Sequence, residues 1–127
     1  MLGKILVCIT PQSNSTRLID KAADLAAAKS GELHILHIEK GNNLFFTAET
    51  PVLLQQLFVY GAERGGVVHG LCGDDIASTI KRFVRENEIT CAVFGEPPAT
   101  AVAAPSIIQR FRDELPMVET VVVPREG

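Results

Sequence analysis

Two adjacent carboxylates are the first residues in this sequence with the types and spacing for chemistry. Asp74 and Asp75 could act as general acid and base, or could hold a Mg²⁺ ion. Neighbouring side chains point in different directions, however, and this pair directly precedes an expected helix. Carboxylates at a helix start satisfy free backbone N–H groups and interact favourably with the helix dipole. We therefore expect a structural role for both.

The histidines and cysteines give no second site. His34 and His37 lie three apart in an expected strand, so they should face opposite sides and cannot share a metal ion. His69 and Cys72 could approach one another, but a metal centre or a nucleophile needs further partners that the sequence lacks. It also contains no G-x-S-x-G, Walker or G-x-G-x-x-G motif. The sequence predicts neither a catalytic nor a metal site, and so not an enzyme.

The elements that must position these residues alternate regularly. Short apolar runs predict strands at residues 4–9, 32–38, 67–71, 90–94 and 119–123. Helical periodicity and capping residues predict helices over 16–29 and 51–64, and two more that start near 73–75 and 105. Strands that alternate with helices predict one α/β domain over residues 1–127. Its core is a doubly wound, five-stranded parallel sheet with helices on both faces.

In such a sheet, ligands bind outside the carboxyl ends of the strands, where the strand order reverses. This rule selects the loops at residues 10–15, 38–43, 71–75 and 95–104. In the first of them, Ser13 and Ser15 could offer hydroxyls to a phosphate at a helix start. The simpler interpretation is that one of them caps that helix.

Composition excludes several function classes. A net charge of −3, a pI of about 5.6 and scattered basic residues argue against binding to nucleic acid or to anionic membranes. No segment reaches the roughly 18 to 20 apolar residues of a membrane span, and no secretion signal is recognisable. The cysteines are odd in number and far apart, which favours reduced thiols in a cytoplasm.

Several segments resemble the universal stress protein family. Residues 5–39 are similar to its first βαβ unit, and more narrowly to the stress-protein domain of bacterial potassium-sensing histidine kinases. Two later features strengthen the resemblance: the segment 73–77, and the final apolar strand that runs into Val123-Pro124. The resemblance implies the same fold and a stress-response or signalling role, with a sensor kinase or a transporter as partner.

Family members that bind ATP carry an acidic residue after the first strand and the pattern G-x2-G-x9-G-[S/T] after the fourth. Gly95 fits the first glycine of this pattern. The other key positions differ, because Thr10 replaces the acid and Pro98, Ile108 and Gln109 replace the later residues. Proline removes an N–H donor and isoleucine adds bulk where a phosphate would lie. We therefore expect the usual ATP site to be lacking.

Some related kinase domains bind cyclic di-AMP through a Ser-x-Ser motif and a later aromatic-Thr-Ala-x-Tyr strand. Only Ser13 matches that pattern here. Cyclic di-AMP, ATP or AMP thus stays a possibility that comes from the family. Its candidate residues are Thr10, Ser13, Ile38 and Gly95.

The last strand suggests an interaction of another kind. The family's usual strand order makes it an edge strand, and it is strongly apolar, which invites pairing with a second chain. The resemblance implies a homodimer through Thr120, Val121, Val122 and Val123. Our first hypothesis is therefore a non-enzymatic signalling module that works as a homodimer. The alternatives are a nucleotide receptor and, more remotely, a nucleotide hydrolase.

Overall fold

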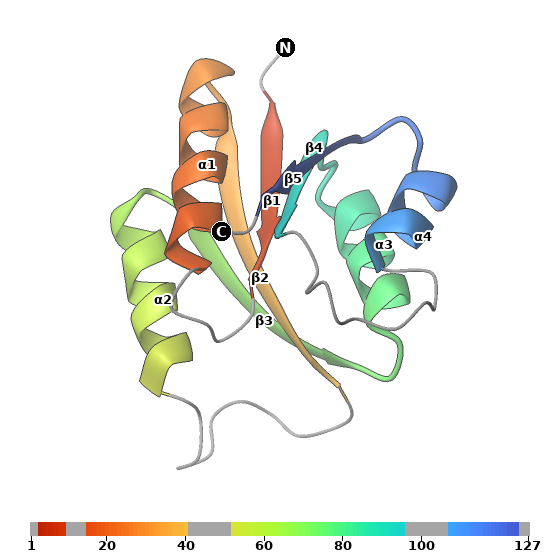
Figure 1. Ribbon diagram of the computed structural model, residues 1–127, viewed down its shortest axis with the longest axis horizontal. Helices are drawn as coiled ribbons and strands as arrows, with labels where there is room; N and C mark the ends of the chain where they lie inside the picture. Colours follow the sequence, from red (N-terminus) through yellow and green to blue (C-terminus); the bar gives the residue numbers. More distant parts are fainter. Residues whose placement is uncertain (1–2, 10–14, 41–51, 96–106, 125–127) are drawn as a thin grey trace.

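The computed structural model describes residues 3–9, 15–40, 52–95 and 107–124. Strands and helices alternate along this part of the chain (Figure 1). The strands are β1 (Lys4–Cys8), β2 (Glu32–Lys40), β3 (Val67–Gly73), β4 (Cys91–Gly95) and β5 (Glu119–Val123). The helices are α1 (Ser15–Ala28), α2 (Val52–Glu63), α3 (Ile76–Glu86) and α4 (Ile107–Glu114). Each expected element is present, with bounds that differ by a few residues from those predicted.

All described strands pair in parallel in the order β3-β2-β1-β4-β5. Val7 in the central strand β1 lies opposite Ile35 of β2 on one side and Val93 of β4 on the other. These three side chains are completely buried. Apolar residues on both faces of the inner strands explain why they read as unbroken hydrophobic runs. The doubly wound parallel fold is confirmed.

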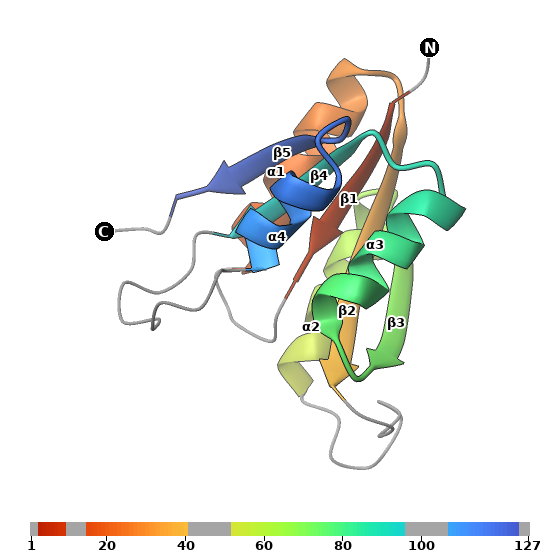
Figure 2. The same cartoon turned by 90° about the vertical axis from the view of Figure 1, so that its right-hand side faces the viewer.

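Helices cover both faces of the sheet, as Figures 1 and 2 show. α1 and α2 pack on one face around Ile19, Ile35 and Leu54, and α3 and α4 pack on the other around Leu36 and Phe83. The two cores are separate because alternate residues of each strand point to opposite faces. Ile5 and Val7 thus belong to the first core and Leu6 to the second.

Two glycines allow tight connections on the first of these faces. Gly31 lies between α1 and β2, and a Cβ atom there would come 1.9 Å from the carbonyl oxygen of Gly3. Gly65, after α2, has a φ of +87°, in the left-handed region that glycine enters without steric cost. The first position needs glycine for space and the second for backbone conformation.

Candidate functional site

The strand order reverses between β1 and β4. From β1 the chain moves outward through β2 to β3, and then it crosses the sheet to β4 and β5. In open α/β sheets, ligands bind outside the carboxyl ends of the two strands at which the strand order reverses. The candidate ligand site is therefore this edge of the sheet.

Gly95 is the last residue of β4 and lies at this edge. A Cβ atom there would lie 3.3 Å from the Leu18 side chain of α1, which is a tight contact. The absence of a side chain lets α1 approach the end of β4 closely. Gly95 is thus where the glycine pattern predicted it, at the end of the fourth strand.

Ile38 lies near the carboxyl end of β2, opposite Leu71 of β3. Its half-buried side chain packs against the core under α3 and α4. β1 separates Ile38 from Gly95 in the sheet, so the two residues are brought to one edge but not into neighbouring strands. Thr10 and Ser13, the remaining predicted ligand residues, lie outside the described residues.

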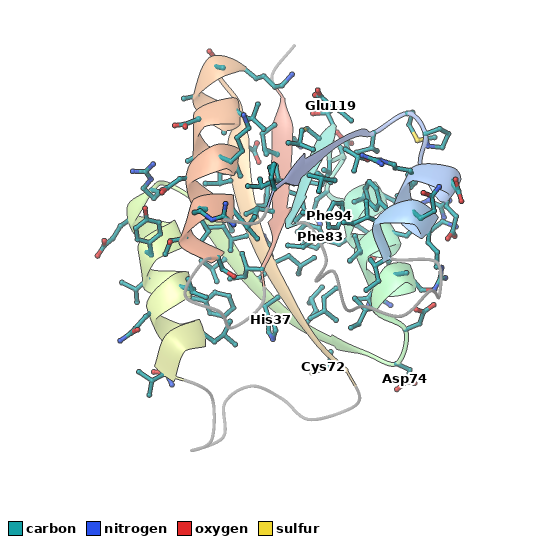
Figure 3. The ribbon with its side chains drawn as sticks, in the orientation of Figure 1. His37, Cys72, Asp74, Phe83, Phe94 and Glu119 are labelled. Carbon is teal, nitrogen blue, oxygen red and sulfur yellow. The ribbon has the colours of Figure 1, made fainter. Side chains whose placement is uncertain are left out.

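His37 is a site residue that the sequence did not single out for this role. Its Nδ1 lies 3.0 Å from the carbonyl oxygen of Ile9, and its side chain is buried. A carbonyl can only accept, so Nδ1 carries the hydrogen and donates it. The N–H of Ile9 in turn donates to the carbonyl of Leu36 at 2.9 Å. Together these bonds hold the end of β1 against β2 at the candidate edge. Figure 3 labels His37.

Asp75 immediately precedes α3, where the sequence placed a structural carboxylate. Ser78 donates to one carboxylate oxygen at 2.6 Å, and Arg110 of α4 lies 3.3 Å from each of the two oxygens. The hydrogen bonds from Ser78 and then Arg110 hold the pKa of Asp75 below its usual value. Asp74 is exposed, as Asp75 is.

The histidines follow strand alternation. His34 and His37 point to opposite faces of β2, as predicted: His34 contacts Phe83 of α3, whereas His37 bonds to Ile9. The suggested approach of His69 to Cys72 is wrong. His69 faces Phe83, while Cys72 packs against the core under α1 and α2, because residues three apart on a strand lie on opposite faces.

β5 is an outer strand, as expected. Its neighbour on the inner side is β4, and the N–H of Glu119 donates to the carbonyl of Thr90 at 3.0 Å. Since backbone groups alternate in direction along a strand, Thr120 and Val122 direct theirs away from β4. On the helix side, Arg17 of α1 donates to the Pro124 carbonyl at 2.7 Å and holds the end of β5.

The side chains of β5 are more buried than is expected for a strand at the edge of a sheet. Thr120, Val121, Val122 and Val123 are all half-buried. The Thr120 hydroxyl is buried, and it has no hydrogen-bond partner among the described residues. A buried, unpaired hydroxyl costs free energy, which marks this strand as a place where further contacts would stabilise the protein.

The described ranges 3–9, 15–40, 52–95 and 107–124 contain neither a metal-binding cluster nor a membrane-spanning helix. No three His, Cys, Asp or Glu side chains gather there in a way that could hold a metal ion. No helix in these ranges has the length and apolar character that a membrane crossing requires.

The fold and this edge agree with a known family. The model of the universal stress protein family matches residues 1–104. This chain belongs to the universal stress protein family. The resemblance seen in the sequence is thereby confirmed.

Curated relatives extend the comparison to a sensor kinase. The chain is 26% identical over 92 residues to the sensor protein KdpD of Mycobacterium tuberculosis, which covers 72% of this chain. It matches only 10% of the length of that relative. The similarity is thus to a stress-protein domain within a much longer protein.

Solved structures with low sequence identity share the fold. A universal stress protein of Archaeoglobus fulgidus superposes with a TM-score of 0.73 at 19% identity, over 99% of this chain and 45% of the other. A universal stress protein in complex with cAMP gives 0.70 at 15% identity over 98% of both chains. An A. fulgidus member in complex with dAMP gives 0.64 at 18% identity, over 99% of this chain and 100% of the other.

Proposed function

We propose that this universal stress protein is a non-enzymatic signalling module that forms a homodimer through β5 and acts through a protein partner in the cytoplasm. The strand carries the proposal, because it combines an open edge, half-buried apolar side chains and a buried unpaired hydroxyl. Pairing with a second β5 would satisfy the outward backbone groups and cover more of the valines.

The direction of the backbone groups allows a sharp test of the dimer. Val122→Pro removes an N–H that points away from β4, so it should prevent pairing while the β4–β5 hydrogen bonds are kept. Val122→Thr is the matched control, because threonine is also β-branched and keeps the N–H. Size-exclusion chromatography with light scattering should give twice 13.7 kDa for the wild type and the control, and 13.7 kDa for the proline variant.

Either of two results contradicts the dimer. One is a wild-type mass of 13.7 kDa at micromolar concentration. The other is a dimer that persists in a Val122→Pro variant whose circular dichroism matches that of the wild type.

The protein partner we propose is a sensor kinase or a transporter. The similarity to a domain within the KdpD sensor protein supports a kinase, because that relative carries this kind of domain within a signalling protein. The test is binding of the purified protein to the rest of a potassium-sensing kinase in biolayer interferometry. Saturable binding supports the proposal if Val122→Pro or another surface substitution abolishes it. If the folded protein does not bind, this partner is rejected.

A nucleotide receptor is the second candidate. The strand reversal at β1 and β4, the side-chain-free Gly95 and the His37 bond to Ile9 support it, because they form an ordered edge where this kind of sheet accepts ligands. Relatives with cAMP and dAMP bound lend further support. We propose cyclic di-AMP, ATP or AMP as the ligand of this alternative.

Isothermal titration calorimetry distinguishes the two candidates. The sequence has no tryptophan, so intrinsic fluorescence would report poorly on binding. Saturable micromolar binding of cyclic di-AMP, ATP or AMP would establish a receptor. No heat with any of them, from a folded protein, leaves the partner-binding module. Phosphate release from ATP, measured in parallel, would contradict the non-enzymatic proposal.

A further inference from the structure

His34 and His69 form a pair of rings on the second face of the sheet. Nδ1 of His34 lies 3.0 Å from Nε2 of His69, and the ring centroids are 5.3 Å apart. Nε2 of His34 lies 3.1 Å from a carboxylate oxygen of Glu32. A chain of hydrogen bonds therefore runs from β3 through β2 to Glu32.

This chain of bonds determines which nitrogens carry hydrogen when both rings are neutral. His34 must donate to the carboxylate through Nε2, which leaves its Nδ1 as an acceptor. His69 must then donate to that acceptor through its own Nε2. In this state both contacts are hydrogen bonds and no ring is charged.

The pair can take up one proton without loss of either bond. If His34 becomes an imidazolium, both its nitrogens donate: one to Glu32 and the other to His69, whose hydrogen moves to Nδ1. The added charge then lies beside a carboxylate. A second proton is different, because it places two N–H donors and two positive charges face to face at 3.0 Å.

Among the described residues, Glu32 is the only carboxylate with a contact to either ring. The rings are covered by Phe83 of α3, whose centroid lies 4.7 Å from His69 and 6.1 Å from His34. The charged side chains of α3 are those of Lys81, Arg82, Arg85 and Glu86, so most of them are cations. Lys81 forms an ion pair with Glu114 of α4, and Arg82 forms one with Glu86.

On the sheet side, Glu32 is the carboxylate that faces the pair. Its neighbour in β1 is Lys4, whose ammonium group lies 3.9 Å from Glu88. Burial and then the His34 charge lower the pKa of His69 from its ordinary value of 6.5. The surroundings therefore accommodate one positive charge on the pair and oppose a second.

We propose that the His34–His69 pair is an acid-sensitive latch that fastens the outer strand β3 and helix α3 to β2, and that the second proton opens it. β3 is the outermost of the described strands on its side of the sheet, so β2 and the covering helices hold it in place. Its release would expose the β2 edge at Ile38, which pairs with Leu71.

The sign of the pH effect follows from the lowered pKa of His69. The unfolded or detached state binds this proton more readily than the closed state does. The stabilisation is thus fully present above the unfolded value of 6.5, and it is lost as the pH falls from there toward the lower folded pKa. Acid should loosen β3 while β5, at the opposite edge, stays in place.

The protein has three histidines, so each ring can be followed by long-range ¹H–¹⁵N spectra of histidine-labelled protein. At pH 8, His34 and His69 should both show Nε2–H. During acidification, the two rings should report the same two coupled steps, the second below the ordinary value of 6.5. His37 is the internal control: it donates through Nδ1 on the opposite face of β2 and keeps that donor when protonated.

Hydrogen exchange locates the opening. After correction for intrinsic exchange rates, protection of the β3 amides should fall at least tenfold between pH 7 and 5, with little change in β5. His69→Gln keeps an N–H donor for His34 but does not titrate, so it should abolish this selective loss.

Two outcomes overturn the latch. One is independent, single-step titration of His34 and His69 in the wild type, a measurement that does not depend on any variant folding. The other is a loss of protection that is uniform over β3 and β5, or unchanged in a folded His69→Gln variant.

Discussion

The guanidinium of Arg110 in α4 reaches both carboxylate oxygens of Asp75, at 3.3 Å each, and so joins α4 to the residue that precedes α3. Glu114, one turn further along α4, accepts a hydrogen bond from Lys81 of α3 at 3.0 Å. α3 and α4, which are connected through β4, thus contact each other at two places along α4. These contacts position the start of α3 at the carboxyl edge of the sheet.

Loss of the Asp75–Arg110 contact should weaken the protein slightly. Both side chains are about half exposed, so solvent and salt screen the attraction. Arg110→Gln should lower the urea midpoint by a small amount, and the difference from wild type should shrink in 1 M NaCl. Because the pKa of Asp75 is lowered, this stabilisation is present above its ordinary value of 3.8 and is lost as the pH falls through the folded pKa. A difference that grows with salt would contradict the assignment.

Phe111 should be the residue that anchors α4. It is the buried residue of this short helix, and its ring meets Phe94 of β4 edge-on at a centroid distance of 5.2 Å. Phe111→Ala should lower the free energy of unfolding by about 3 to 5 kcal/mol, the usual cost of an aromatic core truncation. Ile107→Ala in the same helix is the control, with an expected loss well under that because Ile107 is 39% exposed. Equal losses in urea denaturation would refute this role.

The two connecting glycines should respond differently to alanine. Gly65→Ala should cost about 1 to 2 kcal/mol of unfolding free energy, because its φ is positive but no atom lies within 4 Å of the new Cβ. Gly31→Ala should cost more, because the new Cβ would collide with the backbone of Gly3 and push the α1–β2 connection away from the start of β1. Urea denaturation of the two variants, compared at one temperature, checks the order. A Gly31 variant as stable as the Gly65 variant would contradict it.

The Cys91 thiol should be unreactive in the folded protein. Cys91 is 1% exposed, and burial followed by the Glu119 charge raises its pKa to about 11. At pH 8 the thiolate fraction is then roughly one in a thousand. Burial likewise raises the pKa of Cys8 to about 12. Iodoacetamide labelling with peptide mass spectrometry should leave both unmodified until urea is added. Rapid labelling of Cys91 in native buffer is the contrary result.

The sequence by itself determined the elements and their order. Residues 5–9 and 91–94 are apolar at every position, as expected for strands buried on both faces, and the helices between them carry one apolar stripe. Alternation of the two leaves a parallel sheet as the solution, since crossovers are right-handed. The position of β5 at the edge came from the family's strand order, and Gly95 from its glycine pattern.

Only the tertiary structure decided which side chains meet across the sheet. Strand alternation alone separates His34 from His37, but the pairing of His34 with His69 depends on the register of β2 against β3. The bond from His37 to Ile9 likewise depends on how far β1 extends beside β2. A sequence pattern predicts the type of element from its period and the face on which each residue lies, and both are local properties. Register and helix placement are set by the summed packing of both cores, and these determine the partners of each polar group.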